Sequence, residues 1–89
     1  MIKIIRQANS FKADLKRITK RHKKLEKLYL IVEKLACDID LDAKNHPHKL
    51  SGNYSNKWEC HIEPDWLLIY EVTDEMVILY RTGSHADLF

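Results

Sequence analysis

The hydrophobic period of this 89-residue sequence changes once, near the middle, and that change limits the possible folds more than any other feature. Residues 10–20 and 23–36 carry apolar side chains three or four positions apart, which predicts two amphipathic helices. From residue 57 onward apolar and polar side chains alternate, which predicts strands over residues 57–62, 66–72 and 76–82. Two helices followed by three hairpin-connected strands indicate an α+β fold, with the helices packed on an antiparallel sheet.

The remaining segments complete this order of elements. Residues 1–7 are rich in isoleucine and predict a first strand, so that the order is β-α-α-β-β-β within one domain spanning residues 1–89. Ser10 is the expected N-cap of the first helix, and KRHK at residues 20–23 is the expected turn of a helical hairpin. Residues 37–56 are rich in Asp, Asn and Ser, which predicts a long irregular connection of the kind that often carries function.

Basic side chains are concentrated in the first third of the chain. Residues 1–27 contain ten Lys or Arg and two acids, a net charge of +8, whereas residues 28–89 have a net charge of −6. A basic segment on an acidic body is typical of a protein that binds phosphate groups, although the exposed face of a helix also collects lysines. The candidate RNA-binding lysines are Lys16, Lys20, Lys23, Lys24 and Lys27.

Other features concern the cellular setting. No stretch approaches the roughly 20 apolar residues that span a bilayer, and the N-terminus has no apolar segment of signal-peptide length, so we expect a cytoplasmic protein with no membrane partner. Two cysteines are too few for the disulfide framework of a small secreted domain. Cys60 alternates with Trp58 and Ile62, which indicates a small buried residue rather than a reactive thiol.

Side chains suited to acid–base chemistry and phosphate binding accumulate in and beside the predicted sheet. His61 projects from the polar side of its strand, and Asp65 follows in the next turn. Arg81 lies near the end of the last predicted strand, and His85 follows it by four residues. His48 lies in the long connection between residues 37 and 56. Imidazoles serve as base and acid near neutral pH, a carboxylate can orient an imidazole, and arginine clamps phosphate oxygens.

This combination suits cleavage of RNA with no metal ion or other cofactor. The ribose 2′-OH must lose a proton and attack the adjacent phosphorus, the phosphate charge must be stabilised, and the leaving 5′-oxygen must gain a proton. The nucleophile is already part of the substrate, so a metal is not required to generate it. The last residue, Phe89, would add a surface on which a base can stack.

Three segments resemble the YafQ family of toxins, which belongs to the RelE/ParE superfamily of type II toxin–antitoxin systems. They are RHKKLEKL at residues 21–28, HIEPDWLLIY at 61–70 and RTGSHADLF at 81–89. The resemblance covers nearly the whole chain and implies a RelE/ParE-like fold of the order given above. It implies a ribosome-dependent mRNA endonuclease that inhibits translation and needs no metal.

The resemblance also implies the site residues. By position in the family's motifs the catalytic set is His48, His61, Asp65, Arg81, His85 and Phe89. His85 and Asp65 would take part in acid–base chemistry, with base and acid left open, and Arg81 would stabilise the charge of the phosphate. His48 and His61 would transfer protons or hold the phosphate.

The loop histidine of the family has two candidates in this chain. The spacing to Leu50 and Gly52 favours His48, and the His-Pro pair at residues 46–47 leaves His46 as the alternative.

Partners follow from the same resemblance. The basic helices would contact ribosomal RNA, and mRNA would be the substrate. A cognate antitoxin of the DinJ/RelB type would wrap the toxin, meeting it at residues 20–24 and at the active face of the sheet. Its N-terminal part would dimerise and bind operator DNA, so that the toxin reaches DNA only through the antitoxin.

Three other interpretations remain open from the sequence. A ParE-like toxin would share the fold and act on DNA gyrase, but it would not need the histidines and Asp65. A zinc site could draw on the histidines and Cys60, although their spacing is unlike that of known ligand sets. An inactive relative that binds RNA would need the basic segment alone.

Overall fold

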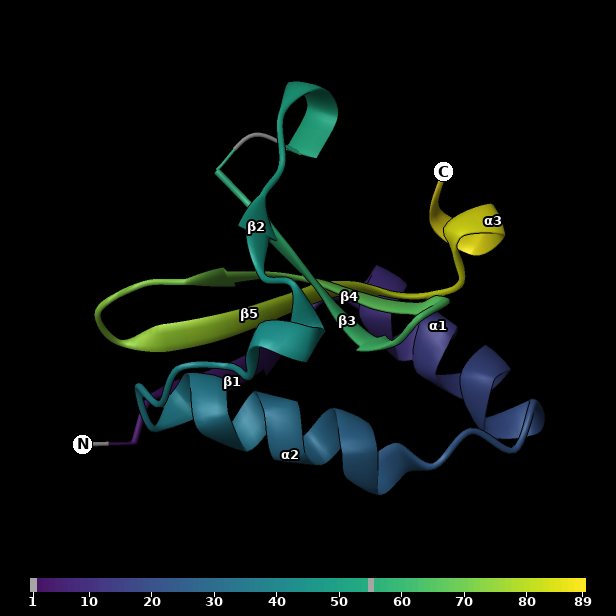
Figure 1. Ribbon diagram of the computed structural model, residues 1–89, viewed down its shortest axis with the longest axis horizontal. Coiled ribbons are helices and arrows are strands. Elements are labelled where there is room, and N and C mark those ends of the chain that lie inside the picture. The colour runs from purple at the N-terminus through teal and green to yellow at the C-terminus, as the bar shows by residue number, and fades with distance from the viewer. Residues whose placement is uncertain (1, 55) are drawn as a thin grey trace.

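A five-stranded sheet with the strand order β1-β5-β4-β3-β2 forms the centre of the structure, a computed structural model that describes residues 2–54 and 56–89 (Figure 1). The strands are β1 (Ile4–Gln7), β2 (His48–Lys49), β3 (Trp58–Glu63), β4 (Trp66–Val72) and β5 (Met76–Gly83). The α-helices are α1 (Asn9–Lys20), α2 (Leu25–Ala36) and α3 (His85–Leu88). Two short 3₁₀ helices, η1 (Ala43–Asn45) and η2 (Gly52–Tyr54), lie in the connection between α2 and β3. The predicted α+β order is confirmed.

Helices α1 and α2 lie on one face of the sheet, and the main hydrophobic core lies between them and the strands (Figure 1). Helix α1 contributes Phe11 and Ile18, and α2 contributes Leu28 and Val32, the side chains whose spacing predicted the helices. The strands contribute Cys60, Trp66, Leu68, Tyr70, Val77 and Leu79. Burial raises the pKa of the Cys60 thiol to about 12, so this cysteine is the unreactive core residue that the alternation indicated.

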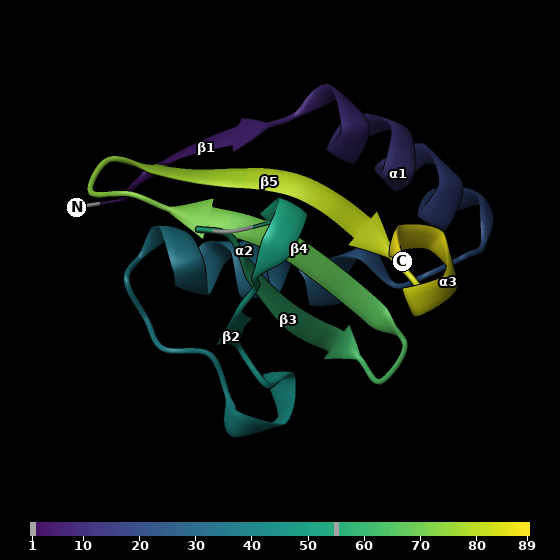
Figure 2. The same ribbon diagram turned by 90° about the horizontal axis from the view of Figure 1, so that it is seen from above.

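The opposite face of the sheet carries a smaller apolar cluster. Leu67 and Ile69 of β4 are fully buried there beneath Leu88 of α3, with Tyr54 of η2 packed against them. Figure 2 shows α3 beside the end of β5, on the side of the sheet away from α2. The C-terminal segment is therefore fixed by a buried leucine on the face of the sheet opposite α1 and α2.

Several local expectations were wrong. Ala8, not Ser10, is the N-cap of α1, because the Ala8 amide still bonds to Leu79 O in the sheet and the helix begins directly afterwards. The Ser10 hydroxyl instead donates to Tyr80 O at 2.7 Å. Residues 37–56 are less irregular than predicted, since η1, β2 and η2 all lie within them.

The sheet is also not wholly antiparallel, because β1 pairs with β5 in parallel. The hairpin connections that predicted antiparallel pairs apply to β3, β4 and β5, whereas β1 reaches β5 through a long crossover. Within the described part of the chain, no helix is both long enough and apolar enough to cross a membrane.

Candidate active site

Strand register brings three of the candidate side chains, together with Glu59, onto the face of the sheet opposite α1 and α2. His48 lies opposite Glu59 of β3, and both Glu59 and Arg81 lie opposite Ile69 of β4. Side chains that face each other across a sheet share a face, and so do residues two apart on one strand, which adds His61. Residues separated by more than 30 positions in the sequence thus form one surface.

His85 and Asp65 form the closest pair in the site. Asp65 Oδ1 lies 2.6 Å from His85 Nδ1 and also accepts the His85 backbone N–H at 2.9 Å. These hydrogen bonds, the backbone one first, hold the pKa of the Asp65 carboxyl below its usual value of 3.8. The carboxylate therefore fixes both the backbone and the ring of His85, while both side chains remain exposed.

His61 occupies the middle of the histidine cluster. Its ring centroid lies 5.7 Å from that of His85 and 5.7 Å from that of His46. Asn45 of η1 donates its side-chain N–H to the His61 carbonyl at 2.7 Å, which fixes the loop bearing His46 against β3. Both loop histidines therefore lie at the site, His46 beside His61 and His48 beside Glu59.

Hydrogen bonds set the proton positions on three imidazoles. The Nδ1 atoms of His48 and His61 face the carbonyl oxygens of His46 and Pro64, at 2.8 Å and 3.3 Å. A carbonyl oxygen only accepts, so each Nδ1 must carry the proton, and the Asp65 carboxylate imposes the same on His85. In all three rings Nε2 is then the nitrogen that is left for proton transfer.

Glu59 is a site residue that sequence reasoning placed on the polar face but did not select. Its side chain is 7% exposed, and Oε1 lies 3.4 Å from His48 Nε2 and 3.9 Å from His61 Nε2. A buried carboxylate between two imidazoles attracts whichever ring carries a second proton. Its position two residues before His61 was the available signal.

Arg81 is held by a carboxylate that the sequence did not reveal as its partner. Asp14 of α1 is buried; its Oδ2 accepts from Arg81 Nε at 2.6 Å and its Oδ1 from a terminal guanidinium nitrogen at 3.2 Å. Asp14 also accepts from the Thr82 backbone N–H at 3.1 Å and from Arg17. This carboxylate raises the pKa of Arg81, which stays charged and is fixed in direction.

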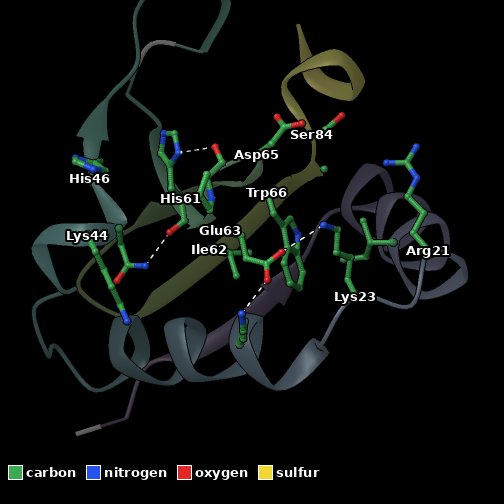
Figure 3. A pocket seen from close by; sticks show the side chains of 15 residues that line it. Arg21, Lys23, Lys44, His46, His61, Ile62, Glu63, Asp65, Trp66 and Ser84 are labelled. Atoms are coloured by element: carbon green, nitrogen blue, oxygen red, sulfur yellow. Dashed lines mark hydrogen bonds and ion pairs between the residues drawn. The ribbon is translucent and has the colours of Figure 1, made fainter.

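An open pocket of about 890 Å³ adjoins the histidines (Figure 3). His46, His61 and Asp65 line one side, and Arg21 and Lys23 of the turn between α1 and α2 line another. Its size and its imidazole and cationic lining suit a negatively charged substrate segment.

The candidate RNA-binding lysines fall into two groups. Lys23 and Lys27 line the pocket and pair with Glu63, at 3.3 Å and 2.8 Å. Figure 3 shows Lys23 directed toward Glu63. Lys16, Lys20 and Lys24 are exposed on and after α1. The two groups therefore face different environments, which the sequence did not distinguish.

Phe89 ends the chain just beyond α3 and is 65% exposed. Its ring stands edge-on to Tyr54, with the centroids 6.0 Å apart. Phe89 is the exposed member of this pair, whereas Tyr54 is partly buried against Leu67 and Ile69. The stacking of a base on Phe89 stays a prediction, and nothing in the sequence indicated Tyr54 as its neighbour.

The lowered pKa of Asp65 gives a pH prediction. Because the pKa is depressed in the folded state, the contribution of Asp65 to stability is present above the ordinary pKa of the carboxyl and disappears as the pH falls through the folded value. The Asp65→Asn variant should therefore unfold at lower urea concentration than the wild type at pH 6, and the difference should shrink below about pH 4. If the two proteins differed by the same urea concentration at every pH from 6 to 2.5, this prediction would be contradicted.

Among the residues that the structure describes, no group of three or more His, Cys, Asp and Glu side chains is arranged to hold a metal ion. The zinc interpretation therefore gains no support from this part of the chain.

Comparison with known proteins identifies the family. The family model for YafQ, a bacterial toxin of type II toxin–antitoxin systems, matches residues 3–89. The mRNA interferase toxin YafQ of Escherichia coli strain K12 is 38% identical over 86 residues, which cover 96% of this chain and 94% of that protein.

Solved structures agree with this match. The toxin in the E. coli DinJ–YafQ toxin–antitoxin complex has a TM-score of 0.91 at 36% identity, covering 100% of this chain and 99% of that one. A metal-bound toxin from Helicobacter pylori has a TM-score of 0.90 at 36% identity, over the full length of both chains. The predicted fold, toxin class and endoribonuclease activity are confirmed, and the chain belongs to the YafQ family of toxins from bacterial type II toxin–antitoxin systems.

Proposed function

We propose that the chain cleaves mRNA on the ribosome by metal-free acid–base catalysis, with His48, His61 and His85 as the proton-transfer groups. The observation that carries the proposal is the Asp65–His85 pair, whose imidazole stands 5.7 Å from that of His61. Two oriented imidazoles at this separation can serve the two ends of one phosphodiester, one removing a proton and the other supplying one.

The reaction needs two proton transfers. One imidazole accepts the 2′-OH proton at its unprotonated Nε2 as the 2′-oxygen attacks phosphorus. A second imidazole that carries both protons gives one to the departing 5′-oxygen, which leaves a 2′,3′-cyclic phosphate and a free 5′-OH. Asp65 and Glu59 stabilise the protonated rings that arise during this exchange.

Arg81 is the proposed partner of the phosphate charge. Asp14 engages Nε and one terminal nitrogen, and the guanidinium has further N–H groups with which to donate to a phosphate oxygen. A guanidinium that is oriented before the substrate binds need not be ordered during the reaction, which favours the transition state.

The cleavage of a defined message with and without ribosomes tests the proposal. Purified protein is mixed with mRNA that is free, bound to ribosomes, or bound to ribosomes with the A site blocked, and primer extension locates any cuts. We expect cuts on the open ribosome complex, in EDTA as well as in its absence once ribosomes are stabilised by polyamines. Cuts of equal rate on free mRNA would overturn ribosome dependence.

The exposed lysines provide a prediction about binding. Changing Lys16, Lys20 and Lys24 together to glutamine should weaken ribosome binding and reduce the slope of log K against log salt by about 2, because each lost phosphate contact removes ~0.7 for single-stranded RNA. The measurement is ribosome affinity at several salt concentrations. An unchanged slope would mean that these lysines are exposed side chains that make no contact with RNA.

The proposed partners also include a DinJ/RelB-like antitoxin, since the related YafQ is found in a complex with DinJ. Contact with operator DNA would then pass through the antitoxin. A location in the cytoplasm, where ribosomes and messages occur, is part of the same proposal.

A further inference from the structure

We propose that Arg21 is a positioning residue for the C-terminal part of the active site and acts through Asp87. The proposal rests on the ribonuclease function proposed above, because it concerns the placement of His85 and Phe89. Arg21 lies in the turn between α1 and α2, and Asp87 lies within α3, 66 positions further along the chain.

The contact between the two residues is bidentate. The two terminal guanidinium nitrogens of Arg21 donate to Asp87 Oδ2 at 2.6 Å and to Oδ1 at 3.1 Å. The Asp87 side chain is 13% exposed, and its hydrogen bonds from the Arg21 guanidinium hold the pKa of this carboxyl well below its usual range. Bidentate pairing with arginine fixes direction as well as distance.

The Asp87 carboxylate also caps the N-terminus of α3. Asp87 Oδ2 accepts from the Ser84 N–H at 2.9 Å, and Ser84 Oγ accepts from the Asp87 N–H at 3.2 Å, which together form a capping box. The connection to β5 is also tight, because a Cβ added at Gly83 would lie 2.8 Å from Asp87 Oδ2. The Asp87 carboxylate thus connects the end of β5, the start of α3 and the turn between α1 and α2.

A support of this kind matters because α3 is a single turn at the end of the chain. One turn of helix is unstable by itself, and chain ends fray unless tertiary contacts hold them. Besides Arg21, the contacts that hold this C-terminal segment to the body include the buried Leu88, the exposed Asp65–His85 pair and the edge of the Tyr54 ring against Phe89. His85 and Phe89 flank Asp87, so an α3 that frays displaces both of them from the site.

The test is a double-mutant cycle with two readouts. The variants are Arg21→Gln, Asp87→Asn and the double variant. The control is Lys12→Gln, which removes a positive charge from an exposed position of α1. NMR hydrogen exchange of the Leu88 and Phe89 amides, which bond to Ser84 O and His85 O, reports the order of α3 without any substrate. Cleavage of ribosome-bound mRNA gives kcat and KM.

We expect each single substitution to speed amide exchange in α3 about five-fold and to lower kcat about ten-fold with little change in KM. The double variant should be no worse than Asp87→Asn alone, since the loss of Asp87 already breaks the contact with Arg21. The Lys12→Gln protein should match the wild type in both measurements.

Three results would overturn the proposal. Unchanged exchange in α3 would show that the pair does not order this segment. Faster exchange with an unaltered cleavage rate would show that its order does not limit catalysis. A higher KM in Arg21→Gln alone, with Asp87→Asn like the wild type, would mean that Arg21 binds RNA directly. If the wild type cleaves no RNA, the proposed function fails, and the positioning role fails with it, while the exchange data still show whether the pair orders α3.

Discussion

Replacing His85 with alanine is expected to lower the rate of mRNA cleavage by ~10²–10⁴-fold, the contribution of a positioned proton-transfer group. The imidazole is held by Asp65 on its Nδ1 side, so its Nε2 is available to the substrate. Because the ring is more than half exposed, its removal leaves no cavity in the core, and the fold should persist.

The measurement is single-turnover cleavage of ribosome-bound mRNA, with urea unfolding of the same protein samples as the control for the fold. We expect the free energy of unfolding to change by less than about 1 kcal/mol. The Asp65→Asn variant is the matched comparison, since it keeps the imidazole but weakens its orientation, and its loss of rate should be smaller. Cleavage at the wild-type rate by the His85→Ala protein would remove His85 from the mechanism.

Replacing Asp14 with alanine is expected to lower the free energy of unfolding by about 3 kcal/mol, the lower end of the effect of removing one partner from a buried ion pair, because Asp14 is buried while Arg17 and Arg81 are partly exposed. Asp14 is 3% exposed and receives hydrogen bonds from two arginines and from the buried Thr82 N–H. Its removal leaves these donors without an acceptor at the junction of α1 and β5. Such a loss is a large part of the ~5–15 kcal/mol that stabilises a typical domain.

Urea unfolding followed by circular dichroism measures this loss. The control is Asp74→Ala, an exposed aspartate in the turn between β4 and β5, which should change the free energy of unfolding by less than about 0.5 kcal/mol. A loss at Asp14 no greater than that at Asp74 would mean that Arg81 and Thr82 find other partners, and that Asp14 does not fix the direction of Arg81.

The sequence predicted the elements of this fold because their signals are local. Helical spacing in residues 10–20 and 23–36 and alternation after residue 57 each reflect which side chains face the core, and the core contains them. The candidate site residues could also be named from the sequence, because the HIEPD and RTGSHADLF segments carry the family's pattern. The chemistry of imidazole, carboxylate and guanidinium is a property of the residue type.

The sequence did not predict contacts between segments that are far apart along the chain. Asp14 lies within the first predicted helix, and only the packing of α1 along β5 brings it to Arg81, 67 positions away. Glu59 was assigned to a polar face, and only the pairing of β2 with β3 brings His48 beside this buried carboxylate. The pairing of β1 with β5 likewise depends on a crossover, which carries no turn signal.

The sequence by itself thus determined the helices, the hairpin strands and the kinds of side chain that the site contains, because hydrophobic period and side-chain chemistry are read from neighbouring residues. Tertiary structure alone decided which carboxylate holds which cation or imidazole: Asp14 with Arg81, Asp65 with His85, and Asp87 with Arg21. The physical reason is that a charge pairs with whatever the fold brings within about 3 Å, and that distance depends on how the layers pack rather than on separation along the chain.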